Sequence, residues 1–317
     1  MTRPTEHTEG VGAGRNAAGA VHAAVAAAAG LGVLAGLTGA AVATLLTQAK
    51  AAARAIEQAA VDAAVRDGLV PPGDDRATVD VARLPVPRAD GVYLPDGTLL
   101  AEPSLVPHRR RVLSVAMLGD STAVGYGVRT AAELPGVALA RQAAAELDRP
   151  VRLRTHGLSG VGAADLDRQV TEALISAPDV AVVVVGANDI RDKVPPRRSA
   201  ELLGAAVSRL RAAGIPVVVG TCPDFGVIEP IPQPLRTVLH TWSRVLAALQ
   251  ERAVLEAGGH PVPVGRIVSP DFLHHPELFA GDHFHPSGAG YAKAVAALLP
   301  PVLLGLRGGQ DEESLVG

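Results

Sequence analysis

A serine follows the first buried strand that the sequence predicts. The apolar run 112–118 indicates a buried strand, and Gly119-Asp120-Ser121 comes directly after it, ahead of a long Ala-rich helical stretch. This order places a hydroxyl at the carboxyl end of a strand and near the start of a helix. Open α/β sheets bind ligands at that edge, and N–H groups at a helix start can stabilise an oxyanion. The pattern therefore indicates nucleophilic chemistry at Ser121.

A second group of reactive residues precedes the last predicted helix, in the run Asp282-His283-Phe284-His285-Pro286-Ser287. A serine hydroxyl is a weak nucleophile until a base accepts its proton, and a histidine is the usual base. An acid beside that histidine accepts its other N–H and fixes its tautomer. His283 and His285 compete for the role of base, and either of them alone could be an ordinary surface residue.

Two further polar turns follow predicted strands. Residues 157–162 form a Gly-rich turn after the second strand, and Gly186-Ala187-Asn188-Asp189 follows the third. Each has a plain structural interpretation, as a flexible turn or as a helix cap. Their position at strand ends in a parallel sheet nevertheless predicts that they lie beside Ser121.

The elements that position these residues alternate along the chain from about residue 111 to 306. Strands are predicted at 112–118, 151–155, 180–185, 216–221 and 262–266, and helices at 131–147, 163–176, 198–213, 235–257 and 287–299. Short apolar strands separated by helices indicate an α/β fold, with a parallel sheet covered by helices on both faces.

Taken together, the four motifs resemble the SGNH (GDSL-type) hydrolase family. The resemblance rests on Gly119-Asp120-Ser121, on Gly160, on Gly186-Ala187-Asn188-Asp189 and on Asp282 to His285. It implies a three-layer α/β/α sandwich with a flavodoxin-like parallel sheet. It also implies a catalytic triad of Ser121, His285 and Asp282, and an oxyanion hole made by the N–H groups of Ser121 and Gly160 and the amide of Asn188.

Some positions depart from the family pattern or compete within it. Thr155 stands where the family often has asparagine, so Gly162 remains a rival to Gly160. The Asp-x-x-His spacing and the following Pro-Ser favour His285 over His283. Asp120 and Asp189 belong to the motifs, but we assign them hydrogen bonds within the turns rather than catalysis.

Composition excludes several classes of protein. The net charge is −3 with both signs interspersed, which does not indicate nucleic-acid binding. The single cysteine, Cys222, excludes an internal disulfide framework. Histidines cluster at 274–285, but without regular ligand spacing, and the hydrolase motif already accounts for Asp282 and His285. We therefore expect no metal and no organic cofactor.

The N-terminal region is apolar over a length that could cross a membrane. No residue between Arg15 and Lys50 is charged, and about 20 residues suffice to span a bilayer. We expect a polar tail at 1–20 and a transmembrane anchor at 21–48. A cleaved signal peptide and a buried soluble helix are the alternatives. The charges on the two sides are nearly balanced, so orientation stays open, with an extracytoplasmic domain slightly favoured.

The remaining segments flank the predicted SGNH hydrolase domain, 110–306. Residues 49–109 are expected to form a helical stalk and then a Pro/Gly-rich linker with a hairpin or turn at 91–97. Residues 307–317 are expected to be a disordered tail.

The sequence therefore predicts a membrane-anchored bacterial ester hydrolase, lipase-like, with a serine nucleophile. The expected substrates are small-molecule, lipid or envelope esters, and the oligomeric state is left open. The alternatives are a carbohydrate O-acetyl esterase or acyltransferase with the same triad, and a membrane-anchored binding domain without turnover.

Overall fold

The computed structural model describes residues 39–70, 79, 84–100 and 111–314. Residues 21–38, the larger part of the predicted anchor, and the polar tail before them lie outside the described residues.

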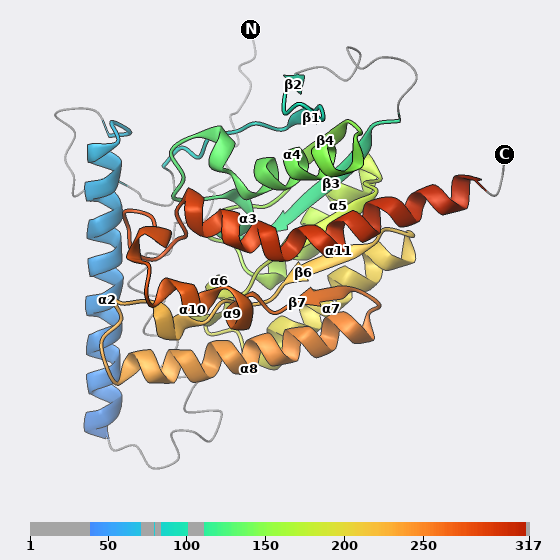
Figure 1. Cartoon of the computed structure of the whole chain (residues 1–317). Coiled ribbons are helices and arrows are strands. Elements are labelled where there is room, and N and C mark those ends of the chain that lie inside the picture. Colours follow the sequence, from blue (N-terminus) through green and yellow to red (C-terminus); the bar gives the residue numbers. More distant parts are fainter. Residues whose placement is uncertain (1–38, 71–78, 80–83, 101–110, 315–317) are drawn as a thin grey trace, which may run out of the picture.

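A seven-stranded sheet forms the centre of the molecule, in the order β2-β1-β4-β3-β5-β6-β7 (Figure 1). The five strands from β4 to β7 in this order are parallel to one another, and β1 runs antiparallel to both of its neighbours. The strands are β1 (Gly91–Tyr93), β2 (Leu99–Leu100), β3 (Leu113–Gly119), β4 (Val151–Thr155), β5 (Val180–Val184), β6 (Val217–Gly220) and β7 (His260–Val262). The sheet is therefore mixed, and the prediction of a wholly parallel sheet is wrong at this edge.

The two extra strands come from the segment expected to be a linker. The hairpin predicted at 91–97 is present, since β1 pairs with β2 across a turn closed by the Leu94 N–H and the Thr98 carbonyl. Val92 and Tyr93 are buried, and the Asp90 carboxylate accepts hydrogen bonds from the N–H and hydroxyl of Thr155. This strand covers the open edge of β4, whose backbone groups would otherwise be left unpaired.

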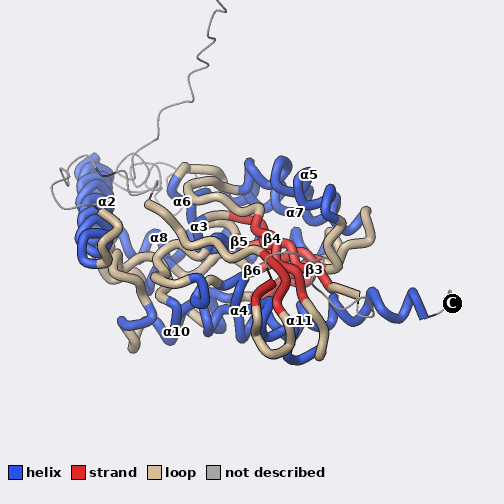
Figure 2. The backbone as a smooth tube through the Cα atoms, turned by 90° about the horizontal axis from the view of Figure 1, so that it is seen from above, coloured by secondary structure: helices blue, strands red, loops and turns tan. Residues whose placement is uncertain are grey.

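Helices cover both faces of the sheet (Figure 2). One face carries α4 (Pro135–Leu147) and α11 (Gly288–Ser314), and the other carries α5 (Leu166–Ser176) and α7 (Pro196–Ala212), with α8 (Leu235–Glu256) packed on α7. The shorter helices are α3 (Ser121–Val124), α6 (Ala187–Arg191), α9 (Val264–Ile267) and α10 (Ser269–Phe272), with single 3-10 turns at Ala131–Glu133, Ala163–Asp165, Phe225–Val227 and Pro276–Leu278.

Alternate side chains of β3 divide the core into two layers. Val115 and Met117 pack with α4 and α11, whereas Ala116 and Leu118 pack with α5 and α7. Both sets are almost fully buried, which accounts for the unbroken apolar run in the sequence. The three-layer α/β/α arrangement is as predicted.

Two predicted boundaries differ from the structure. The fifth predicted strand, 262–266, ends at Val262, because Pro263 interrupts the ladder and α9 begins at the next residue. The last helix continues to Ser314, well past the predicted domain end at 306, so most of the predicted disordered tail is helical.

Helix α2 (Gly39–Arg66) lies across the end of the domain toward which the parallel strands point (Figures 1 and 2). It includes the last ten residues of the predicted anchor, 39–48, and the predicted stalk. Leu45, Ala49 and Ala52 are buried with Phe225 and Trp242 in one apolar cluster. The helix continues through residue 48, the predicted boundary between anchor and stalk, and its residues on both sides of that position pack on the domain.

Among the described residues, one helical stretch, Gly288–Gly308 in α11, has the length and apolarity to cross a membrane. Its side chains Val295, Leu298 and Val302 are buried against the sheet, so this stretch is a core helix of the sandwich.

Candidate active site

The turn after β3 is fixed by a glycine and by a buried glutamine. Gly119 has φ +131°, and a Cβ at this position would lie 1.8 Å from the Val184 carbonyl oxygen, so no other residue fits. The side chain of Gln169 accepts from the Gly119 N–H at 2.6 Å and donates to its carbonyl at 3.0 Å. Gln169 thus fixes both backbone groups of Gly119, the last residue of β3, two residues before Ser121.

Ser121 is the first residue of α3, and Asp120 caps this helix. The Asp120 carboxylate accepts from the Thr122 N–H at 2.9 Å. Burial raises the pKa of Asp120, against the opposing effect of this hydrogen bond. Asp120 therefore has the structural role that the sequence predicted, and its cap directs Ser121 toward the carboxyl edge of the sheet.

The second motif forms a narrow loop between residues 279 and 286. Phe279 and Pro286 face each other in a β-bridge, and the Ala280 N–H donates to the His285 carbonyl at 2.8 Å. At the tip, one oxygen of Asp282 accepts from the N–H groups of Phe284 and His285, each at 2.9 Å. The loop thus orients the carboxylate of Asp282 with its own backbone.

The three predicted triad residues meet in one hydrogen-bonded chain. Ser121 Oγ lies 3.0 Å from His285 Nε2, and His285 Nδ1 lies 2.6 Å from Asp282 Oδ2. Ser121 is 8% exposed and Asp282 4%, while the His285 side chain retains 18%. His283, the rival base, is exposed and has φ +56°. The geometry therefore selects His285.

The electrostatics of Asp282 keep it ionised. Burial acts to raise its pKa, but the charge and hydrogen bond of His285 and the two backbone N–H groups outweigh burial, so the pKa lies below its ordinary value. Aromatic rings fix the imidazole from two sides, since the Tyr126 ring centroid lies 4.5 Å and the Phe284 ring centroid 5.0 Å from that of His285. The sequence analysis did not single out Tyr126.

The Gly-rich turn is held from α6 by two side chains. Asn188 Nδ2 donates to the Val161 carbonyl at 2.8 Å, and Arg191 Nη2 donates to the Gly160 carbonyl at 2.7 Å. Arg191 is itself fixed by the carboxylate of Asp192, with two contacts of 3.0 Å. The analysis of the sequence missed Arg191, although it stands two residues after the Gly186–Asp189 motif.

Gly160 and Gly162 have different surroundings. Gly160 has φ +82°, and a Cβ there would meet nothing within 4 Å, so it faces open space. A Cβ at Gly162 would lie 2.9 Å from Asp189 Oδ1, and the Asp189 carboxylate accepts the Ala163 N–H at 3.1 Å. Burial, together with the nearby Asp120, raises the pKa of Asp189 to about 6. Gly162 is therefore part of the packing beneath the turn, whereas Gly160 lies on its open side.

An apolar cavity of about 110 Å³ adjoins the triad. His285 and Thr122 line it at the catalytic end, and Phe225, Val227 and Ile228 contribute from the proline-rich loop at 223–234. Helix α11 adds Ala294 and Val295. The arrangement can hold an apolar group close to the Ser121 hydroxyl.

The burial of Cys222 and the arrangement of possible metal ligands bear on two other kinds of reactivity. Cys222 is buried, and burial raises the pKa of its thiol well above the ordinary value, which disfavours the thiolate that a cysteine nucleophile requires. Within the described part of the chain, no group of three His, Cys, Asp or Glu side chains is arranged to hold a metal ion.

Comparison with known proteins shows the family of the chain. A family model for the GDSL-like lipase/acylhydrolase family matches residues 117–293. A curated GDSL-like esterase of Mycobacterium tuberculosis (strain ATCC 25618 / H37Rv) is 44% identical over 218 residues, which are 67% of this chain and 68% of that protein. The solved lipase/acylhydrolase from Enterococcus faecalis superposes with a TM-score of 0.51 at 21% identity, over 61% of this chain and 96% of that one.

The fold, the site and these relatives define a hydrolase of the α/β/α type. The chain belongs to the GDSL-like lipase/acylhydrolase family, and it is an ester hydrolase.

Proposed function

We propose that this enzyme cleaves carboxylic esters through a covalent acyl-enzyme on Ser121. The observation that supports this mechanism is the chain of contacts from Ser121 Oγ through His285 to Asp282, at 3.0 and 2.6 Å. His285 Nε2 takes the Ser121 proton as Oγ attacks the acyl carbon, and then gives it to the leaving alcohol. Water, deprotonated by the same nitrogen, attacks the acyl-enzyme and releases the acid.

The contacts of the Asp282 carboxylate define its role and the tautomer of His285. Asp282 Oδ2 accepts the Nδ1–H of His285, so the Nε2 nitrogen is left free of a proton to act as base. When the imidazole becomes charged during attack, the ionised Asp282 stabilises it. The low pKa of Asp282 keeps that carboxylate charged throughout the pH range in which a histidine base works.

The oxyanion of the tetrahedral intermediate would be held by three donors. Ser121 begins α3, so its N–H has no partner within that helix. Asn188 carries two amide N–H groups, and Val161 accepts one of them. The second, with the N–H of Gly160, completes the set. Loss of one such donor is expected to lower the rate by about 10²–10³.

The apolar cavity beside the triad is proposed to hold the acyl chain of the substrate. Its walls carry few polar groups, and Thr122, next to the nucleophile, lies at one end. An apolar acyl chain gains free energy from leaving water there, whereas a sugar would lose hydrogen bonds. The cavity therefore favours an acyl ester over a carbohydrate bound at this position.

We also propose that residues 21–38 attach the enzyme to a membrane. This stretch contains no charged residue, and its length is at the short end of the roughly 17–25 residues that a spanning helix needs. It directly precedes α2, which packs on the catalytic domain. The expected substrates would then be lipid or envelope esters close to the membrane. Such substrates would place the catalytic domain on the extracytoplasmic side.

The test is hydrolysis of a short-chain and a long-chain chromogenic ester by the wild type, Ser121→Ala, His285→Ala and His283→Asn. We expect the first two variants to lose turnover and His283→Asn, which keeps a residue tolerant of positive φ, to retain it. Turnover by Ser121→Ala at the wild-type rate would refute the mechanism. Activity on acetyl esters alone would show that the cavity does not hold a long acyl chain, and would favour an O-acetyl esterase.

A further inference from the structure

Helix α2, which lies outside the segment matched by the family model, touches the loop that carries Asp282. A Cβ added to Gly281 would lie 2.6 Å from the Cβ of Ala63 and 3.1 Å from Arg66 Nη2. Gly281 does not have a positive φ, so the helix, and not the backbone conformation, leaves no room for a side chain there. The residue next in sequence is the acid of the triad.

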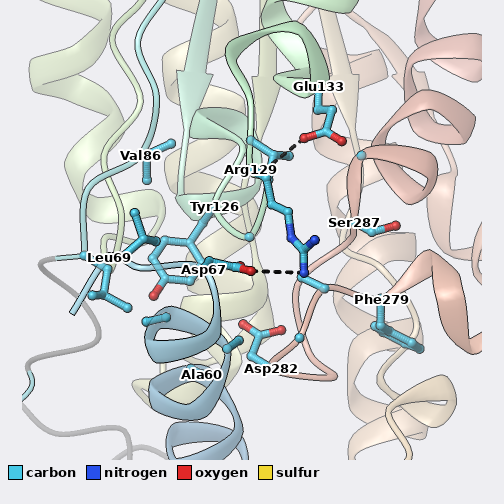
Figure 3. Close-up of a pocket in the computed structure, with 18 of the residues that line it drawn as sticks. Ala60, Asp67, Leu69, Val86, Tyr126, Arg129, Glu133, Phe279, Asp282 and Ser287 are labelled. Carbon is cyan, nitrogen blue, oxygen red and sulfur yellow. Dashed lines mark hydrogen bonds and ion pairs between the residues drawn. The ribbon is translucent and has the colours of Figure 1, made fainter. Parts of the chain in front are cut away.

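Beside this contact the helix and the domain do not touch continuously. A cavity of about 290 Å³ separates them, lined by Ala60, Ala63 and Ala64 of α2 and by Asp282 on the opposite side (Figure 3). Asp67 and Arg129, which form an ion pair 3.0 Å long, are among the residues that line this cavity (Figure 3). The end of α2 therefore supports the catalytic loop at one close contact, beside a space that would allow the loop to shift.

The other flank of the loop is also held where α2 packs. Phe284 lies edge-on to Phe225, with ring centroids 5.9 Å apart. Phe225 belongs to the apolar cluster that contains Leu45 and Ala49 of α2, and Phe284 packs against this cluster. The loop that carries Asp282 thus meets α2 directly at Gly281 and packs, through Phe284, on the cluster that α2 shares.

From these contacts we infer that α2 is a positioning element of the active site: through Ala63 and Gly281 it sets the position of the loop that carries Asp282 and His285 relative to Ser121. This inference rests on the proposed role of Asp282 in the triad. Neither Ala63 nor Gly281 touches the substrate, so both are positioning residues. The enzyme is fully active when α2 is packed against this loop, and any change that separates the helix from the loop lowers its turnover.

The expected effect follows from the geometry of the loop. His285 Nε2 lies 3.0 Å from Ser121 Oγ, and a methyl group on Gly281 must move either the loop that carries His285 or the helix to reach an ordinary van der Waals distance. A displacement of about 1 Å at a catalytic group can lower the rate by about 10²-fold. Because the substrate does not contact Gly281, its KM should change little.

The experiment exchanges the methyl group between the two partners in the full chain. Gly281→Ala is expected to lower kcat on a short-chain ester by about 10²-fold, with KM unchanged, when rates are expressed per site titrated with a serine-reactive phosphonate. The double variant Ala63→Gly/Gly281→Ala removes the methyl group of the helix and adds one to the loop, so the two no longer overlap. Its kcat should return to within about threefold of wild type.

The matched control is Gly204→Ala, because a Cβ there would lie 3.3 Å from the Cβ of Ala253 on the α7–α8 contact. It makes the same change against the same kind of partner, away from the triad, and should leave kcat per site unchanged. Ala63→Ser adds one atom from the helix side. It should lower kcat by a smaller factor, about tenfold, and serves if Gly281→Ala does not fold.

Three outcomes would overturn the inference: a wild-type kcat per site in Gly281→Ala or, should that variant not fold, in Ala63→Ser; a double variant no faster than Gly281→Ala; or a loss in Gly204→Ala equal to that in Gly281→Ala. Ser121→Ala, measured in parallel, separates the two levels. If it retains turnover, the proposed mechanism fails. If it is inactive while Gly281→Ala is fully active, only the role of α2 fails.

Discussion

At the scale of single residues, the site depends on the Asp282 carboxylate, which its surroundings keep ionised. Asp282 is almost fully buried, yet four hydrogen-bond or charge contacts lower its pKa. Two other buried acids near the nucleophile, Asp120 and Asp189, have raised pKa values because burial dominates there. The surroundings thus distinguish Asp282, the acid that we propose assists catalysis, from Asp120 and Asp189, which hold the turns.

Asp282→Asn tests this assignment. The amide has a single accepting oxygen, so when that oxygen accepts from the backbone N–H groups of Phe284 and His285, its NH2 group donates to His285 Nδ1. The resulting wrong tautomer should lower kcat by about 10⁴-fold, as for an orienting acid in other serine triads. KM should be nearly unchanged. A kcat within tenfold of wild type would show that Asp282 does not orient the base.

The same substitution carries a prediction about stability and pH. Because the folded-state pKa of Asp282 is lowered, its contribution is present above the unfolded value of about 3.9 and is lost as pH falls through the lower folded value. Urea unfolding should therefore show wild type more stable than Asp282→Asn at pH 7, with the difference shrinking below about pH 4. A difference independent of pH would contradict the lowered pKa.

Arg191 is a residue-scale feature that the sequence motif did not reveal. Nη2 of its guanidinium donates to the Gly160 carbonyl at 2.7 Å, and the Asp192 carboxylate accepts from both Nε and Nη2. Arg191→Ala should let the turn that carries Gly160 move and lower kcat by about tenfold or more, with Arg191→Lys in between. The measurement is kcat and KM on a short-chain ester, with Arg197→Ala, a residue of α7, as control. An unaltered kcat in Arg191→Ala would exclude this role.

At the scale of elements, the sequence was informative wherever local pattern decides structure. The strand before Ser121 and the helices on both faces follow from unbroken apolar runs and helical stretches, because parallel strands are buried on both sides. The strand predicted at 262–266 was misplaced because Val262 and Val264 are both β-branched apolar residues, of the kind that strands favour. Only Pro263 and the pairing with β6 decide where the ladder ends.

The acyl cavity is built by several elements, so its size can be changed from one of them. Ala294 lies on α11 and lines the cavity. Ala294→Phe should fill part of the space and lower kcat/KM on a long-chain ester by about tenfold or more relative to a two-carbon ester. An equal effect on both esters would place the acyl chain elsewhere. Ala296→Phe, at an exposed position of the same helix, controls for a general effect on the helix.

At the scale of the whole molecule, contacts between distant segments escaped the sequence analysis. The pairing of β1 with β4 joins residue 92 to residue 152. No local pattern in the Pro-rich segment that contains β1 indicates this pairing. The last ten residues of the predicted anchor, 39–48, belong to α2, which packs on the domain through Leu45 and Ala49. Apolarity alone does not distinguish a lipid partner from a protein one.

The proposed membrane attachment can be separated from catalysis. Removal of residues 1–38 leaves α2 and everything after it, so we expect the shortened chain to keep its kcat on a soluble ester. The full chain should sediment with membranes and resist extraction by high salt, while the shortened chain should remain in the supernatant. Equal behaviour of the two chains in sedimentation would refute an anchor at 21–38.

The central claim is that Ser121 is the nucleophile and that His285 activates it. The most direct measurement is the site and rate of labelling by a fluorophosphonate, followed by mass spectrometry of the digested protein. The account predicts one phosphonylated peptide, containing Ser121, labelling about 10²-fold or more slower in His285→Ala, and none at that site in Ser121→Ala. Labelling of a different residue, or an unchanged rate in His285→Ala, would contradict it.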